Sequence, residues 1–223
     1  MNNNSSRADI LGRVRAALRH DPALAGERRN KVFEDLAAAT EGPRPKLVGD
    51  LLERFCRCSQ AMSSTVDRLS SIAEVPAAVA RYLSAAGLPA VAVCWHEYAS
   101  LDWAGAGLAV APRAARDDDL VGITGDFCAI AETGTLMLLS GLTTAATTSS
   151  RPEMHIAIVL AARVVAGMEE GFALLRQEHG ELPRAVNFIS GPSRTGDIEL
   201  TIVLGAHGPY RVHLVVVGAA PEG

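Results

Sequence analysis

The stretch Phe127-Cys-Ala-Ile-Ala-Glu-Thr-Gly-Thr-Leu-Met-Leu-Leu139 contains two β-prone runs that are joined by a short turn. Gly134 lies in this turn and can adopt the positive φ angle that a tight connection requires. The stretch therefore predicts an antiparallel hairpin. The hairpin interrupts the pattern of the chain, because the segments on either side of it alternate between helical and strand-like patterns.

Outward from the hairpin, short apolar runs that are typical of buried strands alternate with amphipathic helical segments. This alternation predicts an α/β fold of three layers, in which a mainly parallel sheet carries helices on both faces and includes the antiparallel hairpin. The expected strands are residues 90–94, 108–111, 155–160, 186–190 and 212–217, and the expected helices are 47–55, 75–86 and 165–177. Residues 197–204 fit either a strand or a helix.

The N-terminal part of the chain differs in composition from the rest. Ser6 can cap a helix in which Ile10, Val14 and Leu18 recur at helical spacing. The following residues, 21–45, are polar and rich in proline, with at most a short helix near 32–39. We therefore expect an N-terminal helix and connector over residues 1–45 and one compact domain over residues 46–223.

Charge and lysine usage exclude several classes of function. The net charge is -4, although residues 1–60 alone have a net charge of +3. The sequence contains no run of Lys or Arg of the kind that indicates nucleic-acid binding. Lys31 and Lys46 are the only lysines, so the body of the domain can form neither a Walker A loop nor a Schiff base. The sequence shows no signal-peptide pattern and no apolar run long enough to span a bilayer, which predicts a cytoplasmic protein.

The four cysteines, Cys56, Cys58, Cys94 and Cys128, form no CxxC pair and no zinc-finger or iron–sulfur spacing. We therefore expect no metal site and no cofactor in this chain.

Three stretches together resemble the LUD-domain family, which includes lactate-utilisation protein C. They are Gly122-Ile-Thr-Gly-Asp-Phe-Cys-Ala-Ile-Ala-Glu-Thr-Gly-Thr-Leu136, Phe188-Ile-Ser-Gly-Pro-Ser-Arg-Thr-Gly-Asp-Ile-Glu199 and Gly205-Ala-His-Gly-Pro209. The resemblance runs from about residue 61 to 218. It implies a fold similar to the group of sugar-phosphate isomerases, CoA-transferases and formyltetrahydrofolate cyclo-ligases.

The resemblance also implies a role in oxidation of L-lactate to pyruvate beside partner subunits that carry iron–sulfur clusters. It does not imply that this chain is a catalyst alone. Two alternatives stay open. One is an independent transferase, isomerase or ligase acting on a CoA ester, a sugar phosphate or a folate. The other is a scaffold whose N-terminal helix recruits the partners. Homo-oligomerisation also stays open.

The candidate site residues fall in the same three stretches. Glu132 is a candidate nucleophile or general base, with Thr133 and Gly134 beside it, and His207 is a candidate for proton exchange. The hydroxyl-rich turn after residue 190 suits a small anion, with Arg194 as the cationic group. The ligand-binding candidates are Thr133, Gly134, Ser193, Arg194, Thr195, Asp197 and Gly208.

Two further points concern His155 and Arg151. His155 heads an apolar strand, which favours a buried structural histidine over a metal site shared with His207 and Glu132. The family usually has an arginine in the segment before this strand, whereas residues 143–150 contain none. If that arginine binds a carboxylate in the family, either Arg151 substitutes for it or this chain has lost the capacity to bind the carboxylate.

Overall fold

The computed structural model describes residues 3–18, 24–38, 42–196 and 203–218. The chain divides into two units, residues 1–45 and residues 46–223. The first unit contains the helices α1 (Asn3–Ala17) and α2 (Ala25–Ala38), the second of which is longer than the sequence predicts. None of the helices in the described ranges has both the length and the apolar character needed to cross a membrane.

The second unit is built on a parallel sheet of six strands in the order β1-β12-β7-β4-β2-β3. The strands are β1 (Thr65–Leu69), β2 (Val91–Cys94), β3 (Ala109–Pro112), β4 (Val121–Thr124), β7 (Met154–Leu160) and β12 (Arg211–Val217). The central strands β7 and β12 are buried along almost their entire length, as strands covered on both faces must be.

The hairpin forms as predicted, from β5 (Cys128–Ile130) and β6 (Thr135–Leu139), but it lies in a second sheet. This sheet has the order β8-β5-β6-β9 and includes β8 (Val164–Val165) and β9 (Val186–Ile189). Both faces of the hairpin are apolar, so burial on both sides is favourable. A third pairing joins β10 (Arg194–Thr195) and β11 (Val203–Leu204).

The helices of the second unit are α3 (Leu51–Ala61), α4 (Val75–Ala85), α5 (Thr147–Ser150) and α6 (Met168–Glu178). Short 3-10 turns lie at η2 (Ile72–Glu74), η3 (His96–Tyr98) and η4 (Ala161–Arg163). Asp50 is the N-cap residue of α3, and its carboxylate accepts a hydrogen bond of 2.9 Å from the Glu53 N–H. Gly167 is the N-cap residue of α6, and its N–H donates a hydrogen bond of 2.9 Å to the Glu170 carboxylate.

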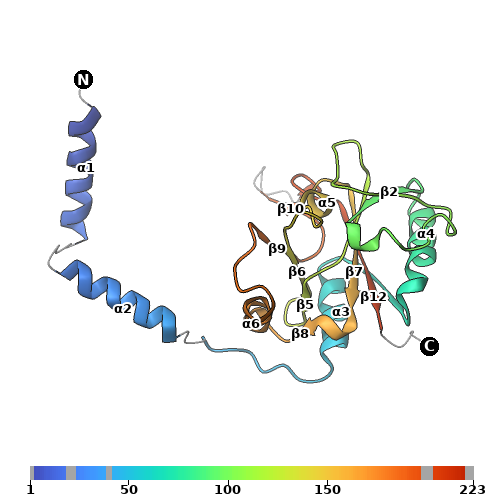
Figure 1. Cartoon of the computed structure of the whole chain (residues 1–223), viewed down its shortest axis with the longest axis horizontal. Coiled ribbons are helices and arrows are strands. Elements are labelled where there is room, and N and C mark those ends of the chain that lie inside the picture. The colour runs from blue at the N-terminus through green and yellow to red at the C-terminus, as the bar shows by residue number, and fades with distance from the viewer. Residues whose placement is uncertain (1–2, 19–23, 39–41, 197–202, 219–223) are drawn as a thin grey trace. The chain divides into compact units, whose positions relative to one another are not determined.

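Figure 1 shows α4 on one side of the strands β7 and β12, and α3 with the strands of the second sheet on the other side. Alternating residues of the strands pack into these different layers. In β7, Ile156 and Ile158 pack on the α4 side, whereas Ala157 and Val159 pack with α3 and the hairpin. In the hairpin, Leu136 and Leu138 face the parallel sheet, and Met137 packs in a third cluster near α6. The three-layer α/β fold is thus confirmed, with α4 on one face of the parallel sheet and α3 with the second sheet on the other.

The tip of the hairpin is fixed against α3. Gly134 has φ +67°, and a Cβ atom placed there would lie 2.3 Å from the backbone nitrogen of Ser59. The Ser59 hydroxyl donates a hydrogen bond of 3.1 Å to the Gly134 carbonyl oxygen. Both the backbone angle and the close approach therefore require glycine at this position.

We expect Gly134→Ala to lower the free energy of unfolding by about 3 kcal/mol, because it combines an unfavourable φ angle with a clash against helix α3. Gly87→Ala is the matched control, since Gly87 has the same φ of +67° but open space around its Cβ position. It should cost only about 1 kcal/mol. Urea denaturation of both variants measures the difference, and equal losses would show that the contact with α3 contributes nothing.

Candidate functional site

The structure brings three of the predicted site residues, Ser193, His207 and Gly208, into one cavity of about 570 Å³. We call it the serine pocket. Its walls come from α5, from β9 with the turn that follows it, and from the turn before β12. The lining residues are Ala146, Ser149, Ser150, Val186, Asn187, Phe188, Ile189, Ser190, Gly191, Pro192, Ser193, His207, Gly208 and Pro209.

Backbone contacts hold the two turns of the serine pocket together. The Ser193 N–H donates to the Pro209 carbonyl oxygen at 2.9 Å, and the Gly205 N–H donates to the Ser193 carbonyl oxygen at 2.9 Å. A Cβ atom on Gly208 would lie 3.2 Å from the Ser193 Cβ, so the close packing favours glycine there. The described lining residues offer serine hydroxyls and the exposed His207 imidazole and include no carboxylate, a combination that suits a small anion or a neutral polar ligand.

The candidate residues that follow Ser193 in the second stretch are not among the described residues that line this pocket. Arg194 is exposed and donates to the Met62 carbonyl oxygen at 3.3 Å and to the Ser63 hydroxyl at 2.5 Å. Thr195 pairs with Val203 in the short β10–β11 ladder. Asp197 lies outside the described residues, as do residues 198–202 of the ambiguous segment. The guanidinium of Arg194 therefore contacts the turn after α3, and its role as an anion ligand stays a prediction.

Glu132 does not line the serine pocket. It is half-buried in the hairpin turn, where its backbone N–H donates to the Ala166 carbonyl oxygen at 3.0 Å. Thr133 is connected to the pocket through hydroxyl groups. Its Oγ1 lies 2.7 Å from that of Thr135, which in turn lies 2.6 Å from the hydroxyl of Ser190, a lining residue. Thr135 of the first stretch thus contacts the pocket wall directly, and Thr133 is linked to that wall through Thr135.

His155 and Arg151 have partners elsewhere. His155 is fully buried in β7, and its Nε2 lies 2.8 Å from the Thr124 hydroxyl. Burial lowers its pKa to about 4, so this histidine is neutral at physiological pH. Among the described residues no three His, Cys, Asp or Glu side chains gather as a metal site, so His155, His207 and Glu132 do not form one. Arg151 forms an ion pair with Asp117 and lines neither cavity described here.

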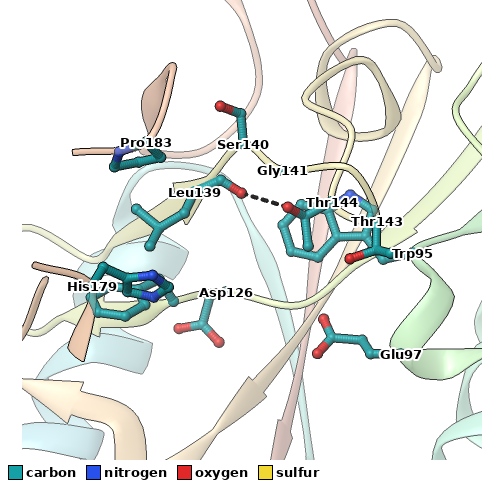
Figure 2. Close-up of a pocket in the computed structure, with 11 residues that line it drawn as sticks. Trp95, Glu97, Asp126, Leu139, Ser140, Gly141, Thr143, Thr144, His179 and Pro183 are labelled. Carbon is teal, nitrogen blue, oxygen red and sulfur yellow. Dashed lines mark hydrogen bonds between the residues drawn. The ribbon is translucent and has the colours of Figure 1, made fainter. Parts of the chain in front are cut away.

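A second cavity, of about 470 Å³, was not foreseen from the sequence (Figure 2). We call it the acid cleft, because Glu97 and Asp126 both line it. The remaining lining residues are Trp95, Phe127, Leu139, Ser140, Gly141, Thr143, Thr144, His179 and Pro183. Four of them, Ser140, Gly141, Thr143 and Thr144, belong to a segment rich in serine and threonine, residues 140–151. Thr144 is fixed there, since its hydroxyl donates to the Leu139 carbonyl oxygen at 2.9 Å.

The two carboxyl groups of the acid cleft differ in environment from ordinary surface acids. Burial raises the pKa of Asp126 to about 8; the nearby Arg163 opposes this shift, and the Glu97 charge adds to it. Burial also raises the pKa of Glu97, while a hydrogen bond from Tyr98 counteracts it. Arg163 does not neutralise Asp126 by direct pairing, because it bonds Glu178 at 2.6 and 3.0 Å and the Phe127 carbonyl oxygen at 2.9 Å.

Sequence reasoning missed Glu97 and Asp126 because their proximity depends on strand order. Each acid follows a short apolar strand, Glu97 three residues after β2 and Asp126 two residues after β4. Acids that follow the carboxyl ends of parallel strands can be predicted to lie near one another, since those ends share one edge of a sheet. The signal was incomplete here, because β4 itself was not among the predicted strands.

The six-stranded parallel sheet with its flanking helices and second sheet places this chain among the three-layer α/β proteins. Sequence comparison identifies the family within that class. The family model described as "LUD domain" matches residues 90–217, and the chain belongs to this family. A solved structure of a DUF162 family protein from Deinococcus radiodurans is similar to 78% of this chain and 100% of its own, with a TM-score of 0.57 and 24% identity. That likeness supports the fold alone.

The curated relatives are named Lactate utilization protein C. The protein from Shouchella clausii is 41% identical over 99 residues, which cover 44% of this chain and 43% of that protein. The protein from Bacillus subtilis is 35% identical over 100 residues, with a coverage of 44% and 42%. The matched segment thus spans less than half the length of the curated relatives.

The raised pKa of Asp126 predicts a pH dependence of stability. Its carboxyl ionises near 3.8 in the unfolded chain and near 8 in the folded protein, so the folded state holds the proton more tightly. Stability should therefore fall as the pH rises from about 4 to about 8. Asp126→Asn removes this titration, and we expect the variant to gain about 2–3 kcal/mol relative to the unchanged protein between pH 4 and pH 8.

Asp118→Asn is the control for this experiment, because Asp118 is an exposed aspartate in the loop before β4. Chemical denaturation of the three proteins at several pH values gives the comparison. An Asp126→Asn curve that runs parallel to that of the unchanged protein would contradict the assignment of a buried, protonated Asp126.

Proposed function

We propose that this protein is an accessory component of bacterial L-lactate utilisation that acts beside subunits carrying iron–sulfur clusters. The observation that carries the proposal is membership of the LUD family together with relatives named Lactate utilization protein C. Cys56 and Cys58 lie on α3, Cys94 on β2 and Cys128 on β5, and we propose that the partner subunits hold the iron–sulfur clusters.

We further propose that the serine pocket binds a small anion such as L-lactate or pyruvate. Its hydroxyl groups and the His207 imidazole are hydrogen-bond donors, and the described lining residues carry no negative charge. His207 is the ionisable group best placed to bind a carboxylate in this pocket or to exchange a proton with it. The hydroxyl relay from Ser190 to Thr133 links the pocket to the hairpin of the first stretch.

Deletion of the gene should abolish or strongly reduce growth on L-lactate as the sole carbon source and leave growth on glucose unchanged. Expression of the full chain from a plasmid should restore growth. Purification of the tagged full chain should also enrich iron–sulfur proteins, detected by mass spectrometry and by their visible absorption. Unchanged growth on lactate in a strain without another lactate dehydrogenase would refute the pathway.

His207→Ala should weaken binding of L-lactate or pyruvate about tenfold, because it removes one hydrogen bond to a charged group. Isothermal titration calorimetry of the full chain with each anion measures this. His96→Ala is the control, since His96 is exposed and lies outside the serine pocket. Equal affinities of both variants would place the anion elsewhere.

Exposed apolar residues of the N-terminal unit support a second, compatible proposal, in which this unit binds the partner subunits. Ile10 and Leu18 of the N-terminal segment are 58% and 70% exposed, and Phe33 and Leu36 of α2 are 63% and 70% exposed. Large apolar side chains that are exposed within their own unit are typical of helices that bind a partner. Removal of residues 1–45 should therefore abolish co-purification of the partner subunits without changing the thermal stability of residues 46–223.

A further inference from the structure

The acid cleft lies at the point where the direction of the sheet connections reverses. β2 leads onward to β3 on one side, whereas β4 leads to β7 on the other, and β2 and β4 are neighbours in the sheet. The loops at their carboxyl ends therefore diverge and leave a crevice between them, the place where open α/β sheets usually bind ligands. Trp95 and Glu97 enter this crevice from β2, and Asp126 and Phe127 enter it from β4.

The side chains of Tyr98 and Glu97 pack closely on Gly125. A Cβ atom on Gly125 would lie 2.2 Å from the Tyr98 hydroxyl oxygen and 2.9 Å from a Glu97 carboxyl oxygen. A larger residue at 125 would therefore have to displace the ends of these two side chains. Figure 2 shows both carboxyl groups on the same side of the cleft, opposite Leu139 and Thr144.

One oxygen of Asp126 has no partner among the described residues. Its Oδ2 is buried without a hydrogen bond, although more than nine in ten buried polar groups in proteins have one. The nearest cation, Arg163, is already bonded to Glu178 and to the Phe127 carbonyl oxygen. Asp126 lines the cleft, so a bound ligand can supply the hydrogen-bond partner that this oxygen lacks among the described residues.

Aromatic and apolar side chains form part of the other walls of the acid cleft. The Trp95 side chain is held by a hydrogen bond of 3.1 Å from its indole nitrogen to the Ala145 carbonyl oxygen, and it is only 4% exposed. Phe127 contacts His179 edge to face, with 5.5 Å between ring centroids, and Leu139 and Pro183 add apolar surface. Neither Lys nor Arg is among the described residues that line the cleft, so a free carboxylate would meet two acids there and His179 as the one basic side chain.

We propose that the acid cleft is a second ligand site, separate from the serine pocket, which binds a planar aromatic or heteroaromatic molecule through a cationic or N–H donor edge. The donor edge bonds the carboxyl groups of Asp126 and Glu97, and the ring packs among Trp95, Phe127 and Leu139. The site selects against small carboxylates. It therefore takes a ligand of the opposite charge type from the one proposed for the serine pocket.

The titration of Asp126 gives the site a measurable signature. Burial raises the pKa of Asp126 to about 8, opposed by Arg163 and increased by Glu97. Tyr98 and Cys128 are also close enough to feel its charge, and His179 lines the same cleft. At pH 7 the carboxyl is mostly protonated, and a cationic ligand binds the ionised form. Binding should therefore release a proton to the solvent and become tighter as the pH rises from 6 to 9.

Three probes of equal size test the proposal on the full chain by isothermal titration calorimetry. Benzamidine is a planar cation with two N–H donors, benzamide is its neutral analogue, and benzoate is its anionic analogue. We expect benzamidine to bind more tightly than benzamide and benzoate not to compete with it. At pH 7, titrations in buffers of different ionisation enthalpy should show release of most of one proton.

Asp126→Asn should weaken benzamidine binding at least tenfold and abolish the proton release, and Glu97→Gln should weaken it severalfold. Asp118→Asn should leave both unchanged. Should the Asp126 variant not fold, the proton release and pH profile of the unchanged protein decide the matter. Benzoate binding as tightly as benzamidine, or benzamidine binding without proton release, would overturn the proposal. Neither result bears on the anion affinity of the serine pocket.

Discussion

Burial of the parallel sheet on both faces is the constraint on which the rest of this structure depends. A strand such as β12 must place Leu214 against α3 and the hairpin while it places Val215 on the α4 side. A shift of register by one residue would exchange these two faces. The faces are not equivalent, since one meets a helix and the other meets a second sheet. Alternate side chains of each strand therefore contact different neighbours, and these contacts determine which layer lies on each face of the sheet.

The sequence was sufficient to predict those elements whose own composition determines their structure. The apolar runs of β7 and β12 and the turn glycine of the hairpin indicate their structures locally. Two strands were missed for physical reasons. β1 includes Asp67 and Arg68, because as an edge strand it is only partly buried. β4 is four residues long and contains Gly122, which permits the Thr148 backbone to approach closely, and such a run resembles a loop.

The candidate site was predictable only in part. Ser193, His207 and Gly208 meet as the neighbouring motifs in the sequence indicate, because a short segment connects them and backbone hydrogen bonds join their turns. Glu132 does not join them, since the hairpin lies in the second sheet and its turn packs against α3. Asp126 lay within the stretch that identifies the family, but its partner Glu97 is separated from it by strand β3. Only the order of strands in the sheet brings these two acids together.

The order of strands also affects how the chain can fold during its synthesis. Among the described strands β1 pairs only with β12, and about 140 residues separate the two in the sequence. Until β12 leaves the ribosome, β1 and the edge of β7 that will receive β12 have unpaired backbone groups. β12 is made after the five other strands of this sheet and is inserted between two of them, so a nascent chain that stalls before residue 211 would expose the edge of β7 to other chains.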